Sequence, residues 1–170
     1  MSTETLRTLV ILRHAKADRP AGVVDFDRPL TERGHADAAA AGAWLGTQDI
    51  RPDLVICSPA RRARQTWHGV AIGLTQESAP LVRYEPQAYE AGVEALLAVL
   101  RTVDDGLGTV LLIGHNPTLS ELSERLAGAA GDSDGLRTAG LAVHTLAAGW
   151  AGLADGAAPC DRTHTARSAG

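Results

Sequence analysis

The chain has 170 residues, of which 45% are apolar, and its formal net charge is −4 at neutral pH. This length suits one domain of ordinary size, and the apolar fraction is sufficient for a core that needs no disulfide bonds. The small negative charge gives no reason to expect a nucleic-acid partner. We therefore expect residues 1–170 to form a single domain.

The N-terminal segment and the cysteines bear on the cellular compartment. The first residues, MSTETLRT, lack the cationic and then apolar pattern of a signal peptide. No apolar run approaches the roughly 20 residues that cross a membrane. Cys57 ends an apolar run and is expected to be a small buried hydrophobe, and Cys160 has a different context, so a secreted disulfide scaffold is not indicated. We expect a cytoplasmic protein without a membrane partner.

Short apolar runs alternate with helical patterns along the chain. In chain order, the sequence predicts a strand at 8–12, a helix that Thr31 caps and that runs past Leu45, a strand at 53–57, a helix at 60–72, a weaker strand at 81–84, a helix at 92–104, a strand at 109–113, a helix at 118–128 and a strand at 141–146. The strongest strands are too apolar to be half exposed, which is typical of strands covered on both faces. This alternation predicts a three-layer α/β/α fold with a mostly parallel sheet. We expect the tail, about 155–170, to form an edge strand and then a disordered end.

Basic side chains follow the three strongest strands, at the point where each strand ends. They are Arg13 and His14 after the first, Arg61, Arg62 and Arg64 after the second, and His115 after the third. The carboxyl ends of parallel strands meet at one edge of a sheet, where ligands of such folds bind. We therefore expect both histidines, the first arginine and one or more of the later three arginines to lie close together.

Such a cluster fits a phosphoryl group. Guanidinium groups bind phosphoryl oxygens through two parallel hydrogen bonds, and helices that start after these turns would add backbone N–H groups. An imidazole among cations is shifted towards its neutral form, whose nitrogen can attack phosphorus. Each segment alone is more often surface decoration, but the three together indicate a phosphate site with a nucleophilic histidine.

Three segments resemble the signatures of a known family. LRHAK, SPARRARQT and IGHNP are similar to those of the histidine phosphatase, or phosphoglycerate-mutase-like, superfamily. Ala15 and Lys16 stand in a first segment that usually reads Arg-His-Gly. Together with PLTERG at 29–34 and AYEA at 88–91, this resembles the small SixA-type phosphohistidine phosphatases. The resemblance covers a core of about residues 7–150.

The resemblance implies a phosphoglycerate-mutase-like fold and a set of site residues. It makes His14 the nucleophile that forms a phosphohistidine intermediate, with Arg13, Arg62 and His115 completing the phosphate pocket. The family's SPxxR spacing selects Arg62 over its two neighbouring arginines. No cofactor or metal is expected, because the pocket supplies its own positive charge and the histidines lack close ligand spacing. The remaining histidines are expected at the surface or in packing: His35, His68, His144 and His164.

The proton donor for the leaving group is the open point. Many relatives use a carboxylate from the region after the third strand, and by position Glu90 is the candidate. Asn116 stands where acid-phosphatase relatives carry an aspartate. Asp18 and Asp25, in the loop after the first strand, are alternatives. An imidazole leaving group needs less help than an alkoxide, because its pKa lies near neutrality, so a SixA-like enzyme could also work without an acid.

The predicted function is that of a metal-independent phosphatase acting through a covalent phosphohistidine intermediate. The substrate would be a phosphorylated protein, such as a histidine-containing phosphotransfer protein, or a small phosphorylated metabolite. Only about twenty residues lie between Gly73 and the next helix, which leaves little chain for a lid and favours an open site. The alternatives are a promiscuous small-molecule phosphatase of the same superfamily, a mutase, which would need a longer enclosing chain, and a non-catalytic phosphate-binding module.

Overall fold

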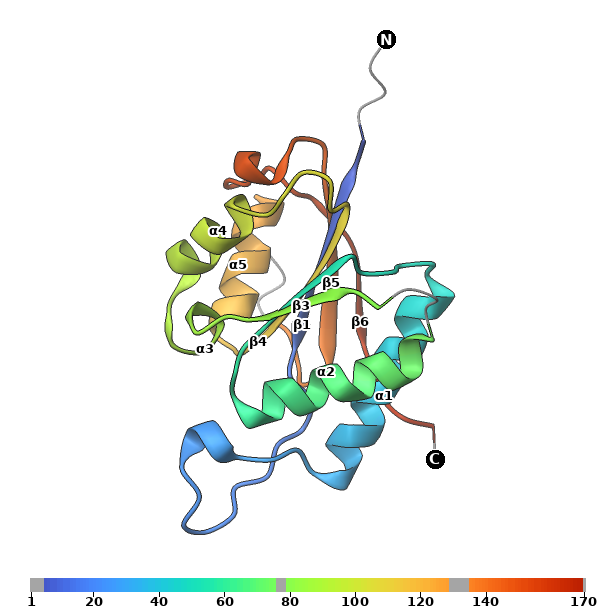
Figure 1. Cartoon of the computed structure of the whole chain (residues 1–170), viewed down its shortest axis with the longest axis vertical. Coiled ribbons are helices and arrows are strands. Elements are labelled where there is room, and N and C mark those ends of the chain that lie inside the picture. Colours follow the sequence, from blue (N-terminus) through green and yellow to red (C-terminus); the bar gives the residue numbers. More distant parts are fainter. Residues whose placement is uncertain (1–4, 76–78, 129–134, 170) are drawn as a thin grey trace.

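A computed structural model describes residues 5–75, 79–128 and 135–169. A central sheet is flanked by helices on both faces (Figure 1). In chain order the elements are β1 (Arg7–Arg13), η1 (Asp25–Asp27), α1 (Glu32–Thr47), β2 (Leu54–Cys57), α2 (Arg61–Leu74), β3 (Leu81–Tyr84), α3 (Gln87–Glu90), α4 (Val93–Arg101), β4 (Thr109–Gly114), α5 (Thr118–Ala127), β5 (Gly140–Leu146), η2 (Trp150–Gly152) and β6 (Cys160–Thr165).

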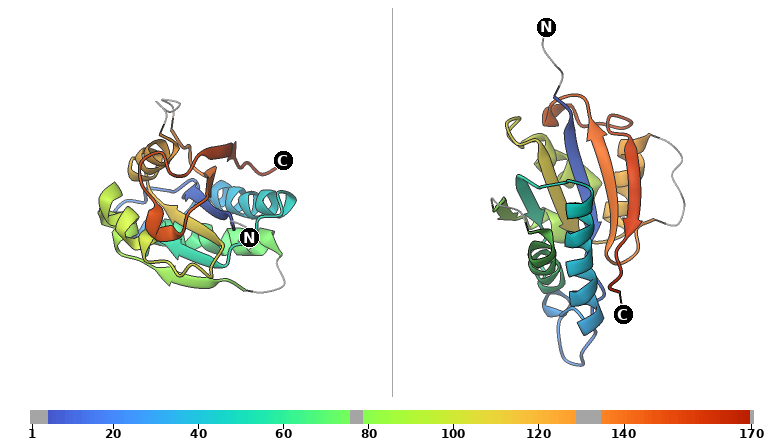
Figure 2. Two further views of the ribbon diagram at one scale, coloured as in Figure 1. Left: turned by 90° about the horizontal axis from the view of Figure 1, so that it is seen from above. Right: turned by 90° about the vertical axis from the view of Figure 1, so that its right-hand side faces the viewer.

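The sheet is mostly parallel, as the sequence predicts. Its six strands have the order β3-β2-β4-β1-β5-β6. The first four strands along the chain run parallel, whereas β5 and β6 are antiparallel additions at one edge. Figure 2 shows the helical layers on opposite sides of the sheet. The three-layer α/β/α prediction is confirmed.

One predicted helix differs from the structure. The segment at 92–104 contains α4, which is shorter, and the one-turn helix α3 precedes it. Ala91 and Gly92 separate the two helices because both have extended backbone conformations. Tyr89, in the one-turn helix before this break, lies with its ring against His115 at the carboxyl edge of the sheet.

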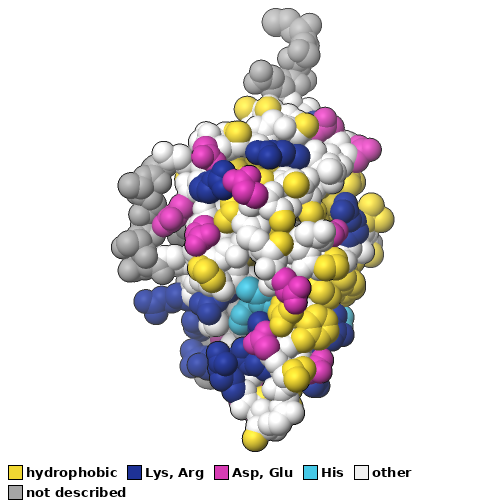
Figure 3. Space-filling view, turned by 90° about the vertical axis from the view of Figure 1, so that its left-hand side faces the viewer, with side chains coloured by type: hydrophobic (Ala, Val, Ile, Leu, Met, Phe, Trp, Pro, Cys, Tyr) yellow, Lys and Arg dark blue, Asp and Glu magenta, His cyan; other side chains and the backbone are white. Residues whose placement is uncertain are grey.

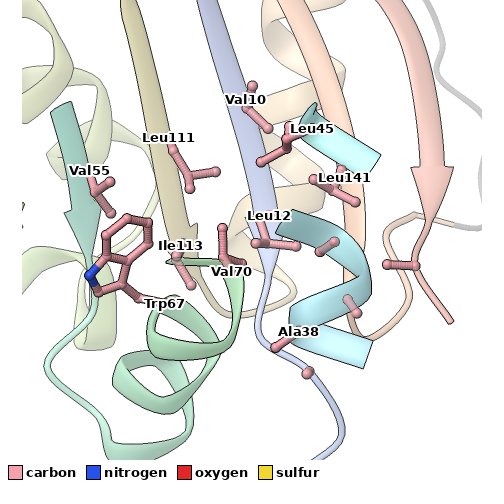
Figure 4. Close-up of a cluster of buried hydrophobic side chains, with 14 of the residues drawn as sticks. Val10, Leu12, Ala38, Leu45, Val55, Trp67, Val70, Leu111, Ile113 and Leu141 are labelled. Carbon is pink, nitrogen blue, oxygen red and sulfur yellow. The ribbon is translucent and has the colours of Figure 1, made fainter. Parts of the chain in front are cut away.

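The apolar run of β1 is explained by its two covered faces. Val10 and Leu12 belong to the core cluster beneath α1 and α2 (Figure 4), and Leu9 and Ile11 to the cluster beneath α4 and α5. All four are fully buried. Burying such a side chain stabilises the fold by about 1.5–3 kcal/mol. The two clusters thus fix the position of β1 and of His14, which follows at its carboxyl end.

Helices α1 and α2 approach each other closely because glycines lie at their contact. A Cβ atom at Gly42 would lie 2.1 Å from the carbonyl oxygen of Val70, and one at Gly73 would lie 2.1 Å from that of Ala39. Side chains at either position would push the helices apart. Close packing therefore sets the position of α2, whose first turn carries three arginines.

The start of α1 is fastened to the segment that follows β1. Thr31 caps the helix, as predicted: its Oγ1 accepts a hydrogen bond from the Gly34 N–H at 3.0 Å. The Lys16 carbonyl accepts from the Thr31 N–H at 2.9 Å, and Ala17 forms a bridge with Leu30. The long connection from β1 to α1 is therefore closed into a loop beside the sheet edge.

The C-terminal tail differs from expectation after its edge strand. β6 pairs with β5. The residues that follow, as far as Ser168, make hydrogen bonds to the rest of the fold and do not form a disordered end. Ala166 is fully buried and its N–H donates to the Ala139 carbonyl, while the Ser168 N–H donates to Asp37 Oδ1 at 2.9 Å. Arg167 lies 3.7 Å from the same buried carboxylate. A buried acidic group on α1 needs such partners, and the tail supplies them.

Cys57 lies in the core, as expected, and Cys160 lies at the surface, and neither forms a disulfide bond. Burial raises the pKa of the Cys57 thiol, which suits a packing role. Within the described ranges, none of the helices is both long and apolar enough to cross a membrane.

Candidate active site

Strand register brings the three predicted segments together. Arg13 pairs with Gly114 in the β1–β4 ladder, and Cys57 pairs with Ile113 in the β2–β4 ladder. The next residue of each strand therefore emerges at the same level of the sheet edge. The His14 N–H donates to the Gly114 carbonyl, and the Ser58 N–H to that of Ile113, both at 3.0 Å. His14, Ser58 and His115 consequently meet.

His14 is buried and has one defined tautomer. Its Nδ1 lies 2.8 Å from the Ala15 carbonyl oxygen. A carbonyl only accepts, so Nδ1 carries the hydrogen, and Nε2 of the neutral ring keeps its lone pair. Burial, with the charges of Arg62 and Arg13, lowers the pKa of His14 to about 4, although the hydrogen bond to Ala15 opposes this shift. At neutral pH the ring therefore presents an unprotonated nitrogen.

The turn after His14 is fastened to α2 through Thr66. The Ala15 N–H donates to Thr66 Oγ1 at 3.0 Å, and this hydroxyl donates to the Arg62 carbonyl at 2.7 Å. Thr66 is fully buried. It links the turn after His14 to the helix that carries the arginines, and the sequence did not single it out.

His115 also has an assigned tautomer. Its Nε2 lies 2.7 Å from Ser58 Oγ, and that oxygen already accepts from the Ala60 N–H at 3.2 Å. Ser58 Oγ can donate its hydrogen to His115 Nε2, and with this assignment the ring hydrogen lies on Nδ1. The ring centroids of His14 and His115 lie 5.2 Å apart. Burial, then the charges of His14 and Arg62, lower the pKa of His115 to about 3, so His115 is a neutral donor here.

Of the three arginines at the start of α2, Arg62 is the one that joins the cluster. It is buried, with 6% of its surface exposed, whereas Arg61 is exposed. Arg64 Nε donates to the Pro59 carbonyl at 2.8 Å. Arg61 and Arg64 lie about 100° and 200° around the helix from Arg62, so when Arg62 faces the sheet edge the other two point away from it.

Arg13 lies at the end of β1 and is held from the opposite side. Its Nη1 donates to the Leu136 carbonyl at 3.2 Å, and the same carbonyl accepts from Asn116 Nδ2 at 2.7 Å. Burial lowers the pKa of the Arg13 guanidinium from its ordinary value, but the group remains charged at neutral pH. Asn116 and Arg13 thus bind the same carbonyl, which ties the segment at Leu136 to the cluster.

Unpaired donors are concentrated at this cluster. Three buried side-chain nitrogens in it lack a hydrogen-bond partner among the described residues: Arg13 Nε, Arg62 Nε and His115 Nδ1. An unsatisfied buried donor costs about 1–3 kcal/mol, so such groups are rare without a function. The three donors surround His14 and match the several acceptor oxygens of one tetrahedral oxyanion.

A carboxylate and an aromatic pair border the cluster. Asp25 Oδ2 accepts from Tyr89 Oη at 2.7 Å and from Arg62 Nη2 at 3.1 Å. The Tyr89 ring lies edge-on to His115, with centroids 5.5 Å apart, and to Phe26, with centroids 5.2 Å apart. From the sequence, Asp25 was expected only as an alternative acid and Tyr89 had no expected role, although it lies within the AYEA segment.

The other carboxylates that the sequence suggested are not in the cluster. Glu90, at the end of α3, is exposed, and its carboxylate has no hydrogen-bond or ion-pair partner in the part of the chain that the structure describes. Asp18 is exposed and accepts from the N–H of Arg19. In Figure 3, histidine side chains reach the surface between a group of Lys and Arg side chains and a group of hydrophobic ones.

The remaining histidines lie elsewhere. His35 and His68 are exposed, His164 stacks on Trp44, and His144 is buried with Ser123 and Ala158 as hydrogen-bond partners. Over the described ranges, no three or more His, Cys, Asp and Glu side chains are grouped so that they could hold a metal ion.

Comparisons with known proteins place this chain in a family. Residues 9–84 match the model of the histidine phosphatase superfamily (branch 1). An uncharacterized protein of Mycobacterium tuberculosis is 37% identical over 92% of this chain and 100% of its own length. Phosphohistidine phosphatase SixA of Escherichia coli is 31% identical over 68% of this chain and 71% of its own.

Among solved structures, a candidate phosphohistidine phosphatase SixA from Nakamurella multipartitia superposes with a TM-score of 0.83 and 33% identity. The match covers 95% of this chain and 96% of that chain. Sequence, fold and coverage agree, and this chain belongs to the histidine phosphatase superfamily.

Proposed function

We propose that the protein is a phosphatase in which His14 is the nucleophile and Arg13, Arg62 and His115 bind the phosphoryl oxygens. One observation carries the proposal: buried donors without partners on these last three residues surround an imidazole whose Nε2 holds a lone pair. A non-catalytic phosphate-binding module would need the donors but not the unprotonated nitrogen.

The reaction would proceed in two displacements. His14 Nε2 attacks phosphorus, the bond between phosphorus and the leaving group breaks, and its electron pair departs with the leaving group. The phosphorylated imidazole is cationic, and the hydrogen bond from Nδ1 to the Ala15 carbonyl stabilises that charge. Water then attacks phosphorus, and the release of inorganic phosphate restores the neutral ring.

The cluster stabilises the charge of the transferred group. Its transition state is loose, with negative charge on three equatorial oxygens, so positioned donors are the main catalytic aid. Arg13 and Arg62 supply permanent charges. His115 is neutral in this structure, but a dianion beside it favours its protonated form. Its Nδ1 hydrogen serves as a donor in either state.

We propose phosphohistidine on a protein as the substrate class. The resemblance to phosphohistidine phosphatase SixA of Escherichia coli, the aromatic pair beside His115 and the arginines around His14 support this choice. A protonated imidazole leaves without further help, which suits a site whose candidate acid, Glu90, is exposed. A small phosphoester is the second candidate, because a site at the surface also admits one.

The first test is turnover of para-nitrophenyl phosphate in EDTA, followed by acid quench with a radioactive phosphoester. The wild type should turn over without a divalent metal and retain an acid-labile, base-stable label. His14→Ala should fold, lose turnover by at least about a thousandfold and retain no label. Activity without a label would contradict the covalent route. Phosphate binding without any turnover would favour the binding module.

A further inference from the structure

Asp25 accepts two hydrogen bonds from one edge of the Arg62 guanidinium. Nη1 donates to the Asp25 main-chain carbonyl at 2.7 Å, and Nη2 donates to Oδ2 at 3.1 Å. Each Nη carries two hydrogens, so one on Nη2 remains, and the buried Nε–H has no partner among the described residues. One edge of the guanidinium is held, and the edge formed by Nε and Nη2 remains available to two phosphoryl oxygens.

Asp25 is itself held by a donor from α3 and by a donor from its own turn. Tyr89, on α3, donates its hydroxyl to Oδ2 at 2.7 Å, and Arg28 Nη1 donates to Oδ1 at 3.2 Å. The Tyr89 ring is packed between His115 and Phe26. The carboxylate is 52% exposed, yet its orientation is determined by three partners. A side chain held in this way can transmit its orientation to Arg62.

The same contacts argue against Asp25 as the proton donor. The hydrogen bond from Tyr89, and then those from Arg28 and Arg62, hold the pKa of the Asp25 carboxyl well below its ordinary range. Such a carboxylate has no proton to give at neutral pH. Its contacts lead to Arg62 rather than to a leaving group.

We propose that Asp25 and Tyr89 are positioning residues for the phosphatase site: Asp25 orients the free edge of Arg62 towards the phosphoryl group, and Tyr89 fixes Asp25. The proposal rests on the proposed function. The alternative is that Asp25 merely lowers the positive charge of the pocket. The two roles predict opposite effects on anion binding, because loss of a negative charge strengthens it, whereas a misoriented guanidinium weakens it.

The decisive comparison is Asp25→Asn against Asp27→Asn. Asp27 is an exposed aspartate of the same short helix, and its carboxylate has no partner within the described residues. We measure kcat and KM for para-nitrophenyl phosphate, the Kd of tungstate by calorimetry, and thermal unfolding. Asp25→Asn should lower kcat by about tenfold to a hundredfold and weaken tungstate binding while remaining folded. Asp27→Asn should stay within about twofold on both measurements.

Tyr89→Phe tests the second link. It removes one hydroxyl and keeps the ring, so kcat/KM should fall about two- to tenfold. Because both residues act through one carboxylate, the double variant should be no worse than Asp25→Asn alone, to within about twofold. A double variant whose loss of kcat/KM equals the product of the two single losses would overturn the proposal. Tighter tungstate binding by Asp25→Asn with unchanged kcat would also overturn it.

Tungstate binding separates this inference from the proposed function. If the wild type turns over no phosphoester but Asp25→Asn still weakens tungstate binding, the phosphatase proposal fails and the orienting role of Asp25 stands. If the wild type is active and Asp25→Asn binds tungstate as well as the wild type does, the orienting role fails and the phosphatase proposal stands.

Discussion

The imidazole rings of His14 and His115 face each other across the ends of β1 and β4, with centroids 5.2 Å apart and planes tilted by 51°. His14 is buried and His115 is half-buried, and each lies among arginines that disfavour a further positive charge. The structure therefore holds two neutral histidines side by side, one with its lone pair on Nε2 and one with its hydrogen on Nδ1. This pairing has consequences for stability as well as for catalysis.

These two histidines should make the protein less stable as the pH is lowered. The folded-state pKa values, about 4 for His14 and about 3 for His115, lie below the ordinary value of 6.5, so the unfolded chain binds more protons. The stabilisation is complete above about pH 6.5 and is lost as the pH falls towards the folded-state values. From pH 7.5 to 5 the loss is on the order of 2 kcal/mol per histidine.

Urea unfolding at both pH values measures this loss. His14→Gln should lose less stability between them than the wild type does. His68→Gln, at an exposed position, should follow the wild type. Equal pH slopes in all three proteins would show that burial of His14 does not affect proton binding.

Arg62→Ala and Arg61→Ala form a matched pair on one helix turn. Arg62 is buried in the cluster with an unpaired Nε, and Arg61 is exposed. Removal of a positioned donor to a developing oxyanion typically costs about a hundredfold to a thousandfold. Arg62→Ala should lose that much kcat/KM for para-nitrophenyl phosphate, and Arg61→Ala less than about threefold. Comparable losses in the two variants would contradict the assignment of Arg62.

Ser58→Ala should impair His115 without touching substrate. The Ser58 hydroxyl directs the His115 tautomer through Nε2, so its loss allows the ring to turn Nδ1 away, and kcat/KM should fall about tenfold. Ser123→Ala is the control, because it breaks a similar bond of 2.8 Å to His144, outside the cluster. If the activities of Ser58→Ala and Ser123→Ala fall only in proportion to their melting temperatures, Ser58 has a packing role alone.

Glu90→Gln decides whether this exposed carboxylate donates a proton. If it does, hydrolysis of an alkyl phosphate should slow by about a hundredfold or more, and that of para-nitrophenyl phosphate much less, since a nitrophenolate departs unprotonated. Phosphohistidine should follow the nitrophenyl ester if its imidazole is already protonated. The measurement is kcat/KM for the three substrates in both proteins. Small, equal losses would make Glu90 a surface carboxylate.

The sequence was sufficient for the strands, the fold class and the identity of the basic cluster. Apolar runs too short for helices predict buried strands, and buried parallel strands bring their carboxyl ends to one edge. Arg13, His14 and His115 directly follow such runs, so their meeting depends only on the order of the strands. Periodicity likewise placed α1, α2 and α5, whose apolar faces each cover the sheet.

Only the tertiary structure decided which side chains hold these groups in place. Thr66, Ser58 and Asp25 act through hydrogen bonds to segments distant in sequence, and nothing in their local pattern reveals the partner. Such bonds depend on strand register, on the close approach of α1 and α2, and on the placement of the short helix α3. Packing of the whole chain sets each of these. Hydrophobic periodicity is a local property of the sequence, whereas the pairing of a particular donor with a particular acceptor depends on three-dimensional distances. For that reason the sequence identified Glu90, which is exposed, and passed over Tyr89 beside it, whose ring lies against His115.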